Sequence, residues 1–157
     1  MRIGQSIDIH QLKQGRPLII GGVSIAHEKG LDGHSDADVL THAIMESILG
    51  ALSLGDLGKH FPDTDARYKG ADSLQLCTCV YEMMVQKGYK VGNVDATIVM
   101  ERPKLAPYIE KMRDNIAKVL HCRLDQISIK ATRGEKMGFI GQEEGAAAIS
   151  VCLLEEV

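Results

Sequence analysis

The N-terminal segment constrains the fold most, because its first nine residues alternate between apolar and polar side chains. Ile3, Ile7 and Ile9 occupy odd positions, whereas Asp8 and His10 occupy even ones. A period of two is typical of a β-strand with one buried face. We expect the isoleucines to face the core, and Asp8 and His10 to share the opposite face, about 7 Å apart along the backbone.

The strongest helix signal begins near Ser35. Asp38 follows three residues later, in the acidic position of a capping box, and apolar residues recur at helical spacing as far as Ala51. His42 falls off this apolar stripe, on the side of Asp38 and Glu46. The helix should therefore turn His42 away from the main core.

The other predicted elements alternate without linkers or repeats. They are one or two short strands in residues 17–27, a loop to His34, a loop after Gly55, a helix over Ser73–Lys87, a strand over Tyr89–Arg102, a helix from Pro107 to Leu120, a strand over 126–132, a loop over 133–145 and a strand over 146–154. This mixture, without a glycine-rich turn between strand and helix, favours an α+β two-layer sandwich with helices on one face of a mixed β-sheet. The specific prediction is a ferredoxin-like arrangement in a single domain, residues 1–157.

Composition excludes several classes of function. The formal charge is −3, and scattered Lys and Arg residues give no footprint for nucleic acid or an anionic membrane. No apolar run approaches the roughly 20 residues that span a bilayer, and polar residues interrupt the N-terminal segment where a signal peptide needs an apolar run. We therefore expect a cytoplasmic protein without nucleic-acid or membrane partners.

The four cysteines do not form a metal-binding pattern. Cys77 and Cys79 are separated by one residue rather than the two of a zinc knuckle, and Cys122 and Cys152 are distant. We predict that all four are small core residues.

Asp8, His10 and His42 form the first chemical candidate. Two histidines and one carboxylate match a catalytic zinc site, which uses three protein ligands and leaves a fourth position open. Each residue alone also suits a solvated side chain or a surface ion pair. Glu46 and Asp38, one helical turn from His42, could orient its imidazole or form an ordinary helix-face pair.

An acidic loop and a lysine form the second candidate. Asp56, Asp63 and Asp65 are more carboxylates than one turn requires, and they suit either turn formation or recognition of polyol hydroxyls. Lys104 follows a strand-ending proline, where it could contact phosphate or remain solvated.

The segment after the strand over residues 126–132 is the third candidate. It places Thr132, Arg133 and Glu135 in a loop at a strand end, where binding groups concentrate. Glu135 could hold a hard cation such as Mg²⁺.

These motifs together resemble one family over essentially the whole chain. The strings DIH, IIGGV, HSDADVLTHA, LGDLGKHFPDTD, KGADS, GNVDATI, PKL, IKAT with EK, and GF before EEG occur in the order and spacing of the 2-C-methyl-D-erythritol 2,4-cyclodiphosphate synthases. The resemblance implies a homotrimer of α+β subunits with active sites between neighbours. It also implies an enzyme of the non-mevalonate isoprenoid pathway, which converts 4-diphosphocytidyl-2-C-methyl-D-erythritol 2-phosphate into the cyclic diphosphate and CMP.

The resemblance also implies roles for individual residues. Asp8, His10 and His42 match the zinc ligands, Glu135 would carry Mg²⁺ or Mn²⁺ on the diphosphate, and His34 would stabilise the transition state. The implied contacts to the substrate are Asp8, His10, His34, Ser35, Asp56, Leu57, Gly58, Phe61, Pro62, Asp63, Thr64, Asp65, Met100, Pro103, Lys104, Leu105, Ala106, Ala131, Thr132, Glu135 and Phe139. The neighbouring subunit would supply residues 100–106 to the same site, so cytidine and its phosphates would be held across an interface.

Three positions depart from the family pattern. Arg133 stands where the family has a threonine that is assigned to the transition state, and a guanidinium is a larger group that neutralises phosphate more strongly. Gln142 replaces a common arginine of the trimer's central cavity, which predicts weak or absent binding of isoprenoid diphosphates. Gln5 replaces a frequent histidine, without a consequence that we can derive.

Two other functions are compatible with these residues. Arg133 suits a trimer that binds nucleotides or diphosphates without cyclising them. The His and Asp residues also suit a zinc phosphohydrolase, although the chain lacks the adjacent His-Asp pair of a dinuclear hydrolase. Retention of all three candidate zinc ligands together with Lys104, Thr132 and Glu135 favours the synthase, because simple binding requires fewer groups.

Overall fold

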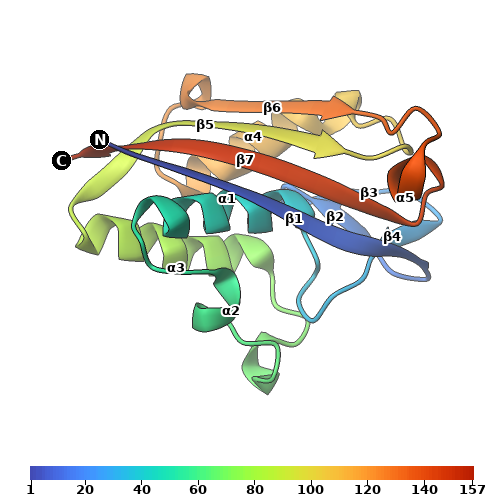
Figure 1. Cartoon of the computed structure of the whole chain (residues 1–157), viewed down its shortest axis with the longest axis horizontal. Helices are drawn as coiled ribbons and strands as arrows, with labels where there is room; N and C mark the ends of the chain where they lie inside the picture. The colour runs from blue at the N-terminus through green and yellow to red at the C-terminus, as the bar shows by residue number, and fades with distance from the viewer.

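A mixed five-stranded sheet forms one layer of the molecule, and three long helices form the other (Figure 1). The computed structural model describes residues 1–157. The sheet consists of β1 (Arg2–Gln14), β4 (Lys29–Leu31), β5 (Tyr89–Val99), β6 (Ile127–Thr132) and β7 (Gly145–Glu156), and a separate ribbon consists of β2 (Leu18–Ile20) and β3 (Val23–Ile25). The order is β4-β1-β7-β5-β6, with only the β5–β6 pair parallel.

The three long helices, α1 (Val39–Ala51), α3 (Ser73–Gln86) and α4 (Ile109–Val119), cover the same face of the sheet, as predicted. The short helices are α2 (Leu57–His60) and α5 (Gly138–Gly141), with 3₁₀ turns at Ala66–Tyr68, Ala106–Tyr108 and Leu124–Gln126. α1 packs on β1 and β7, α4 packs on β6, and α3 lies against both helices. None of these helices is long and apolar enough to cross a membrane.

The ferredoxin-like part of the prediction is wrong. The chain runs β1, α1 and α3, β5, α4, β6 and then β7, whereas a ferredoxin-like fold runs β-α-β-β-α-β. The difference begins after β5, because α4 connects β5 to β6 and makes that pair parallel, and β7 then inserts between β1 and β5 instead of adding to an edge.

The prediction for the two faces of β1 is also wrong. Ile3, Ile7 and Ile9 are more than half exposed on the face without helices, and Gly4 and Ser6 face α1. A Cβ atom on Gly4 would lie 1.8 Å from the Ser47 carbonyl, and Ser6 Oγ donates to the Ala43 carbonyl at 2.6 Å. Small residues are therefore needed where α1 crosses the strand, and hydrophobicity alone could not reveal this.

The first long helix begins at Val39, later than predicted, and its cap is Asp38 rather than Ser35. The Asp38 carboxylate accepts from the backbone N–H of Thr41, and also from those of Gly21 and Gly22 in the turn between β2 and β3. Asp38 is fully buried by these contacts. It therefore anchors the β2–β3 ribbon to α1 and does not share the exposed side of His42.

Most other boundaries agree with the prediction. α3 ends before Gly88, as predicted, and β5 ends at Val99 rather than at Arg102. β4, α2 and α5 fall in segments predicted as loops. All three are only three or four residues long, too short for a periodic pattern to show them.

Two of the four cysteines are core residues. Cys77 and Cys152 are buried, Cys122 is half-buried, and Cys79 is exposed, so the prediction for Cys79 is wrong. Two residues apart on α3, Cys77 and Cys79 point about 200° apart around the helix axis. Only one of them can face the core.

Candidate active site

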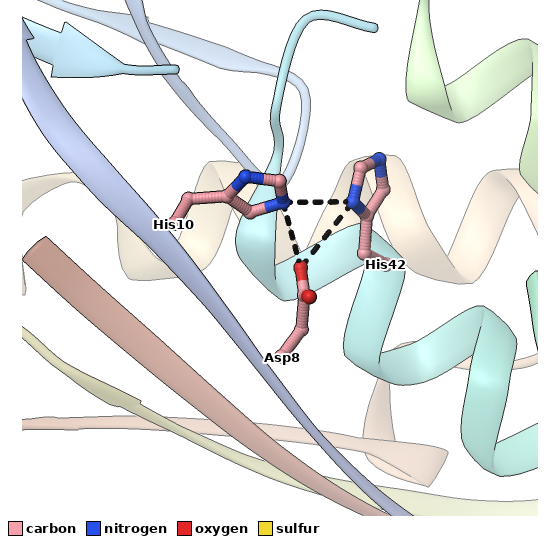
Figure 2. Close-up of side chains that lie close together, drawn as sticks. All are labelled: Asp8, His10 and His42. Carbon is pink, nitrogen blue, oxygen red and sulfur yellow. Dashed lines mark hydrogen bonds and ion pairs between the residues drawn. The ribbon is translucent and has the colours of Figure 1, made fainter. Parts of the chain in front are cut away.

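Asp8 and His10 on β1 meet His42 on α1, as Figure 2 shows. Asp8 Oδ2 lies 2.9 Å from His10 Nε2 and 3.3 Å from His42 Nδ1, and the two ring nitrogens are 3.1 Å apart. All three side chains are partly buried. The alternation of β1 directs Asp8 and His10 to one face, as predicted, and this face is the one that α1 covers.

The protonation pattern around Asp8 suits a positive ion. The His10 Nδ1–H donates to the Asp32 carbonyl at 2.8 Å, and since a carbonyl only accepts, Nε2 of the neutral ring carries the lone pair. Burial alone would raise the pKa of the Asp8 carboxyl, but the hydrogen bonds and positive charge that the facing His10 and His42 rings supply when protonated outweigh burial and hold this pKa well below its usual range. Asp8 is therefore an ionised carboxylate.

The geometry of the three ligand atoms fits a tetrahedral metal ion. Ligand atoms at 2.0–2.2 Å from tetrahedral zinc lie roughly 3.3–3.6 Å from one another, close to the spacing here. Asp8 Oδ2 is also a buried atom without a hydrogen-bond partner of acceptable geometry. A cation between the three atoms would satisfy it. Asp8, His10 and His42 thus form a group compatible with a metal site.

Neither acidic neighbour of His42 on α1 orients its ring. Asp38 is engaged with the β2–β3 turn, and Glu46 accepts from the backbone N–H of Leu57 at 3.2 Å. The far nitrogen of His42, Nε2, instead lies 3.1 Å from Ser35 Oγ and 2.9 Å from Ser73 Oγ.

A cavity of about 540 Å³ opens beside this group and is called the metal-side cavity. The predicted site residues that line it are Asp8, His10, His34, Ser35, Leu57, Gly58, Phe61, Pro62 and Asp63. Gly33, Met45, Glu46, Tyr68 and Leu76 complete the lining together with His42. Most residues predicted for the polyol end of the substrate therefore gather around Asp8, His10 and His42.

Three predicted residues of the acidic loop do not line this cavity. Asp56 caps α2, accepting from Lys59 N at 3.0 Å, and Asp65 pairs with Arg67 at 2.6 Å. Thr64 lies exposed between them. Within a single chain, the carboxylates of Asp56 and Asp65 therefore stabilise local turns, which is one of the two roles predicted for this loop.

The segment that carries His34 and Ser35 is tied from two sides. The Arg16 guanidinium donates to the carbonyls of Gly33 and Ser35, each at 3.3 Å. His34 Nε2 donates to the Asp65 carbonyl at 3.1 Å, which leaves its Nδ1 without a proton when the ring is neutral. Sequence reasoning missed Arg16, because nothing in its local pattern indicates contact with a distant loop.

A second cavity, of about 570 Å³, lies where β5 and β6 end and is called the strand-end cavity. The predicted residues that line it are Met100, Pro103, Lys104, Leu105, Ala106, Ala131 and Thr132, together with His27, Glu101, Arg102 and Arg133. The two strands are parallel, so their exits lie side by side, and the Met100 N–H donates to the Thr132 carbonyl at 3.0 Å. All residues predicted to hold the cytidine and its phosphates therefore line the strand-end cavity.

Two unpaired cations border the strand-end cavity. Arg102 is held by Glu143 at 2.8 Å and lies 3.5 Å from Glu28, whereas Lys104 and Arg133 have no ion pair or hydrogen bond. The charges of Lys104 and Arg133 are therefore available to an anion.

Glu135 and Phe139 line neither cavity. Both are exposed in the segment that follows β6.

The two cavities share no lining residue. Asp8 and His10 are on β1, beside the β4 edge, whereas the strand-end cavity lies where β5 and the edge strand β6 end. The chain is thus an α+β protein with a group of three side chains compatible with a metal ion beside one cavity and unpaired cations beside another.

The chain belongs to the YgbB family, whose model matches residues 1–155. It is similar to a curated protein of Clostridioides difficile named 2-C-methyl-D-erythritol 2,4-cyclodiphosphate synthase, with 62% identity over 98% of this chain and 96% of the relative. A second relative of that name, from Chloroherpeton thalassium, is 58% identical over the full length of both chains.

Solved structures agree in fold. A Plasmodium falciparum IspF structure, described as a CDP complex, aligns with a TM-score of 0.87 and 34% identity over 99% of this chain and 96% of that one. The bifunctional IspDF of Campylobacter jejuni aligns with a TM-score of 0.95 and 39% identity over 99% of this chain but 42% of its own. The family resemblance seen in the sequence motifs is confirmed.

Proposed function

We propose that this protein converts 4-diphosphocytidyl-2-C-methyl-D-erythritol 2-phosphate into 2-C-methyl-D-erythritol 2,4-cyclodiphosphate and CMP. The substrate's 2-phosphate oxygen attacks the β-phosphorus, and the bond from that phosphorus to the CMP oxygen breaks. The observation that carries the proposal is the pairing of a metal group with a cationic cavity in a chain 62% identical to a curated synthase. The predicted cytoplasmic location suits so highly charged a substrate.

Zn²⁺, or another divalent transition metal, is the proposed ion at Asp8, His10 and His42, because two imidazoles and one carboxylate are ligands that zinc favours. When bound, it would supply a Lewis acid that neutralises charge on the β-phosphate. Glu135 is the proposed ligand for Mg²⁺ or Mn²⁺ on the diphosphate.

The metal-side cavity is the proposed site for the methylerythritol phosphate. His34 is the proposed catalytic residue, which would stabilise the transition state, and Ser35 is the proposed phosphate contact. The loop residues Asp56, Leu57, Gly58, Phe61, Pro62, Asp63, Thr64 and Asp65 would bind the polyol. Closure around the reacting phosphates would keep water out, because hydrolysis would give a linear product.

The strand-end cavity is the proposed site for the cytidine and its phosphates. Met100, Pro103, Lys104, Leu105, Ala106, Ala131 and Thr132 would form this half, and Phe139 would lie nearby. The free cations Lys104 and Arg133 would neutralise phosphate charge. The CDP named in the description of the P. falciparum relative supports a cytidine diphosphate ligand.

A homotrimer with active sites between subunits is the proposed assembly. The two cavities share no lining residue within one chain, and neighbouring copies would bring them together. The face of the sheet without helices also exposes Ile3, Ile7, Ile9, Ile149 and Val151. An apolar face of this kind marks a site of association.

The proposed trimer's central cavity is not expected to bind isoprenoid diphosphates tightly. Gln142 has no charge, and its amide donates to the Lys136 carbonyl at 3.1 Å. A titration with geranyl diphosphate that showed tight binding would contradict this.

Phosphorus NMR tests the reaction directly. The purified protein would be incubated with the substrate, Zn²⁺ and Mg²⁺, with a His42→Ala variant as the control. We expect the cyclic diphosphate and CMP from the native protein only. Linear products would indicate a phosphohydrolase, and unchanged substrate on a zinc-loaded trimer would indicate a module that binds nucleotides or diphosphates.

A further inference from the structure

The ring of His42 is held from behind by two residues that the proposed reaction does not use. Figure 2 shows that its second nitrogen points away from Asp8 and His10. This atom, Nε2, lies 2.9 Å from Ser73 Oγ at the start of α3. The Ser73 hydroxyl in turn contacts Asp36 Oδ1, and the Ser73 N–H donates to Asp36 Oδ2 at 3.0 Å. The contacts thus run in a line from Asp36 through Ser73 to His42.

The direction of each hydrogen bond follows from the chemistry of the end groups. A carboxylate only accepts, so the single hydroxyl proton of Ser73 goes to Asp36. The oxygen of Ser73 can then only accept from His42, which places a proton on Nε2. In a neutral imidazole with a proton on Nε2, the lone pair is on Nδ1. Nδ1 is the atom that faces Asp8 and His10.

We propose that Asp36 and Ser73 are positioning residues that fix the tautomer and the orientation of His42, so that its Nδ1 lone pair points at the metal position. The inference rests on the proposed metal site. Hydrogen bonds to the far nitrogen of a ligating histidine set its tautomer and raise its basicity, and their loss typically weakens metal binding about 10- to 100-fold.

Asp36 and Ser73 are themselves held firmly. Ser73 is fully buried as the first residue of α3, and Asp36 Oδ1 also accepts from the Asp38 N–H at 3.1 Å. The Asp36 N–H donates to the Ala71 carbonyl at 3.0 Å. The position of the His42 ring therefore depends on α3 as well as on α1.

Ser35 also contacts the protonated nitrogen of His42. Its oxygen lies 3.1 Å from His42 Nε2 and accepts from the Ala37 N–H at 3.2 Å. Because Nε2 carries a proton, Ser35 cannot donate to it, and its hydroxyl proton is free for an acceptor in the metal-side cavity. A phosphate oxygen of the proposed substrate is such an acceptor.

Nitrogen NMR of the native, metal-free protein tests the tautomer without any substitution. At a pH where the His42 ring is neutral, two-bond and three-bond couplings from the ring carbon protons identify the protonated nitrogen. We expect protonated Nε2 and unprotonated Nδ1. The opposite tautomer would overturn the inference, whether or not the protein proves to be a synthase.

Metal affinity tests the contribution of Ser73. Zinc dissociation constants would be measured by competition with a chromophoric chelator, and we expect Ser73→Ala to bind about 10- to 100-fold more weakly than the native protein. The matched control is Ser47→Ala, because Ser47 is also a buried, hydrogen-bonded serine but does not contact His42. Unchanged affinity in a folded Ser73→Ala variant would contradict the inference.

Asp36→Asn supplies a second variant that keeps the side-chain shape. Both carboxylate oxygens accept backbone N–H groups, so an amide NH₂ would meet a donor in either orientation. We expect weaker zinc binding and a mixture of His42 tautomers by NMR. If the native protein bound no zinc at all, the proposed metal site would fail, whereas the tautomer measurement would still decide the inference.

Discussion

At the scale of single residues, the site depends on which polar groups are satisfied within the chain and which are left free. Arg102 and Arg133 both border the strand-end cavity, but only Arg102 has carboxylate partners. Asp8 Oδ2 is likewise left without a donor of acceptable geometry. Free groups of opposite charge at two cavities suit a ligand that carries phosphates together with a metal cation.

Arg133 is expected to contribute to binding of a nucleoside diphosphate. Replacing it with Met removes an unpaired charge beside the cavity, and we expect CDP to bind about tenfold more weakly by calorimetry, equivalent to about 1.4 kcal/mol. Cytidine, which lacks phosphate, should bind equally to both proteins. Arg102→Gln is the control, since Glu143 already neutralises Arg102. Equal CDP affinity in native protein and Arg133→Met would contradict the role of Arg133.

Cysteine reactivity should follow burial on α3. Burial, with a contribution from the charge of Asp38, raises the pKa of the Cys77 thiol to about 12, so almost no thiolate forms at pH 8. Cys79 is exposed on the other side of the helix. We expect iodoacetamide to label Cys79 in the native protein and to reach Cys77 only after unfolding, as read by peptide mass spectrometry. Equal labelling rates would show that α3 does not pack as described.

At the scale of elements, the close approach of α1 to β1 brings the metal group together. Gly4 and Ser6 leave room for the helix backbone, and Asp8 and His10 continue the same face toward His42. A helix held further from the strand by larger side chains would separate His42 from the other two ligands.

Gly4→Ala tests this packing. Its methyl group would overlap the Ser47 carbonyl, which belongs to rigid helix backbone, and we expect a loss of about 1–3 kcal/mol in the free energy of unfolding from urea denaturation. Gly50→Ala is the control on the exposed side of α1, where only a contact at 3.9 Å is made. Replacing that helical glycine should be neutral or stabilising. Equal stability of native protein and Gly4→Ala would show that α1 can shift freely.

At the scale of the whole molecule, a single chain leaves its proposed active site divided. The metal-side and strand-end cavities share no lining residue, and the face of the sheet that exposes the isoleucines of β1 has no helix over it. In the proposed assembly, Glu135 and Phe139, which line neither cavity in one chain, would reach the site of a neighbouring copy. Assembly is therefore part of the proposed function.

Ile7→Lys tests the proposed assembly. Ile7 is 55% exposed and pairs with Ile149 on β7, so a charge there should disrupt association without entering the core. We expect light scattering to show a trimer for the native protein and a smaller species for the variant. Val85→Lys, at an exposed apolar position on α3, is the control and should remain trimeric. A monomeric native protein would rule out the shared-site proposal.

The amino-acid sequence by itself determined the element types, the α+β class, the grouping of Asp8, His10 and His42, and the family. These follow from local periodicity and from motifs whose spacing along the chain is fixed. Only the tertiary structure decided that the isoleucines of β1 face outward, that β7 inserts beside β1, and that Ser73 rather than Glu46 holds His42. A period of two identifies two faces of a strand but not which one a helix covers, because packing between segments distant in the sequence makes that choice.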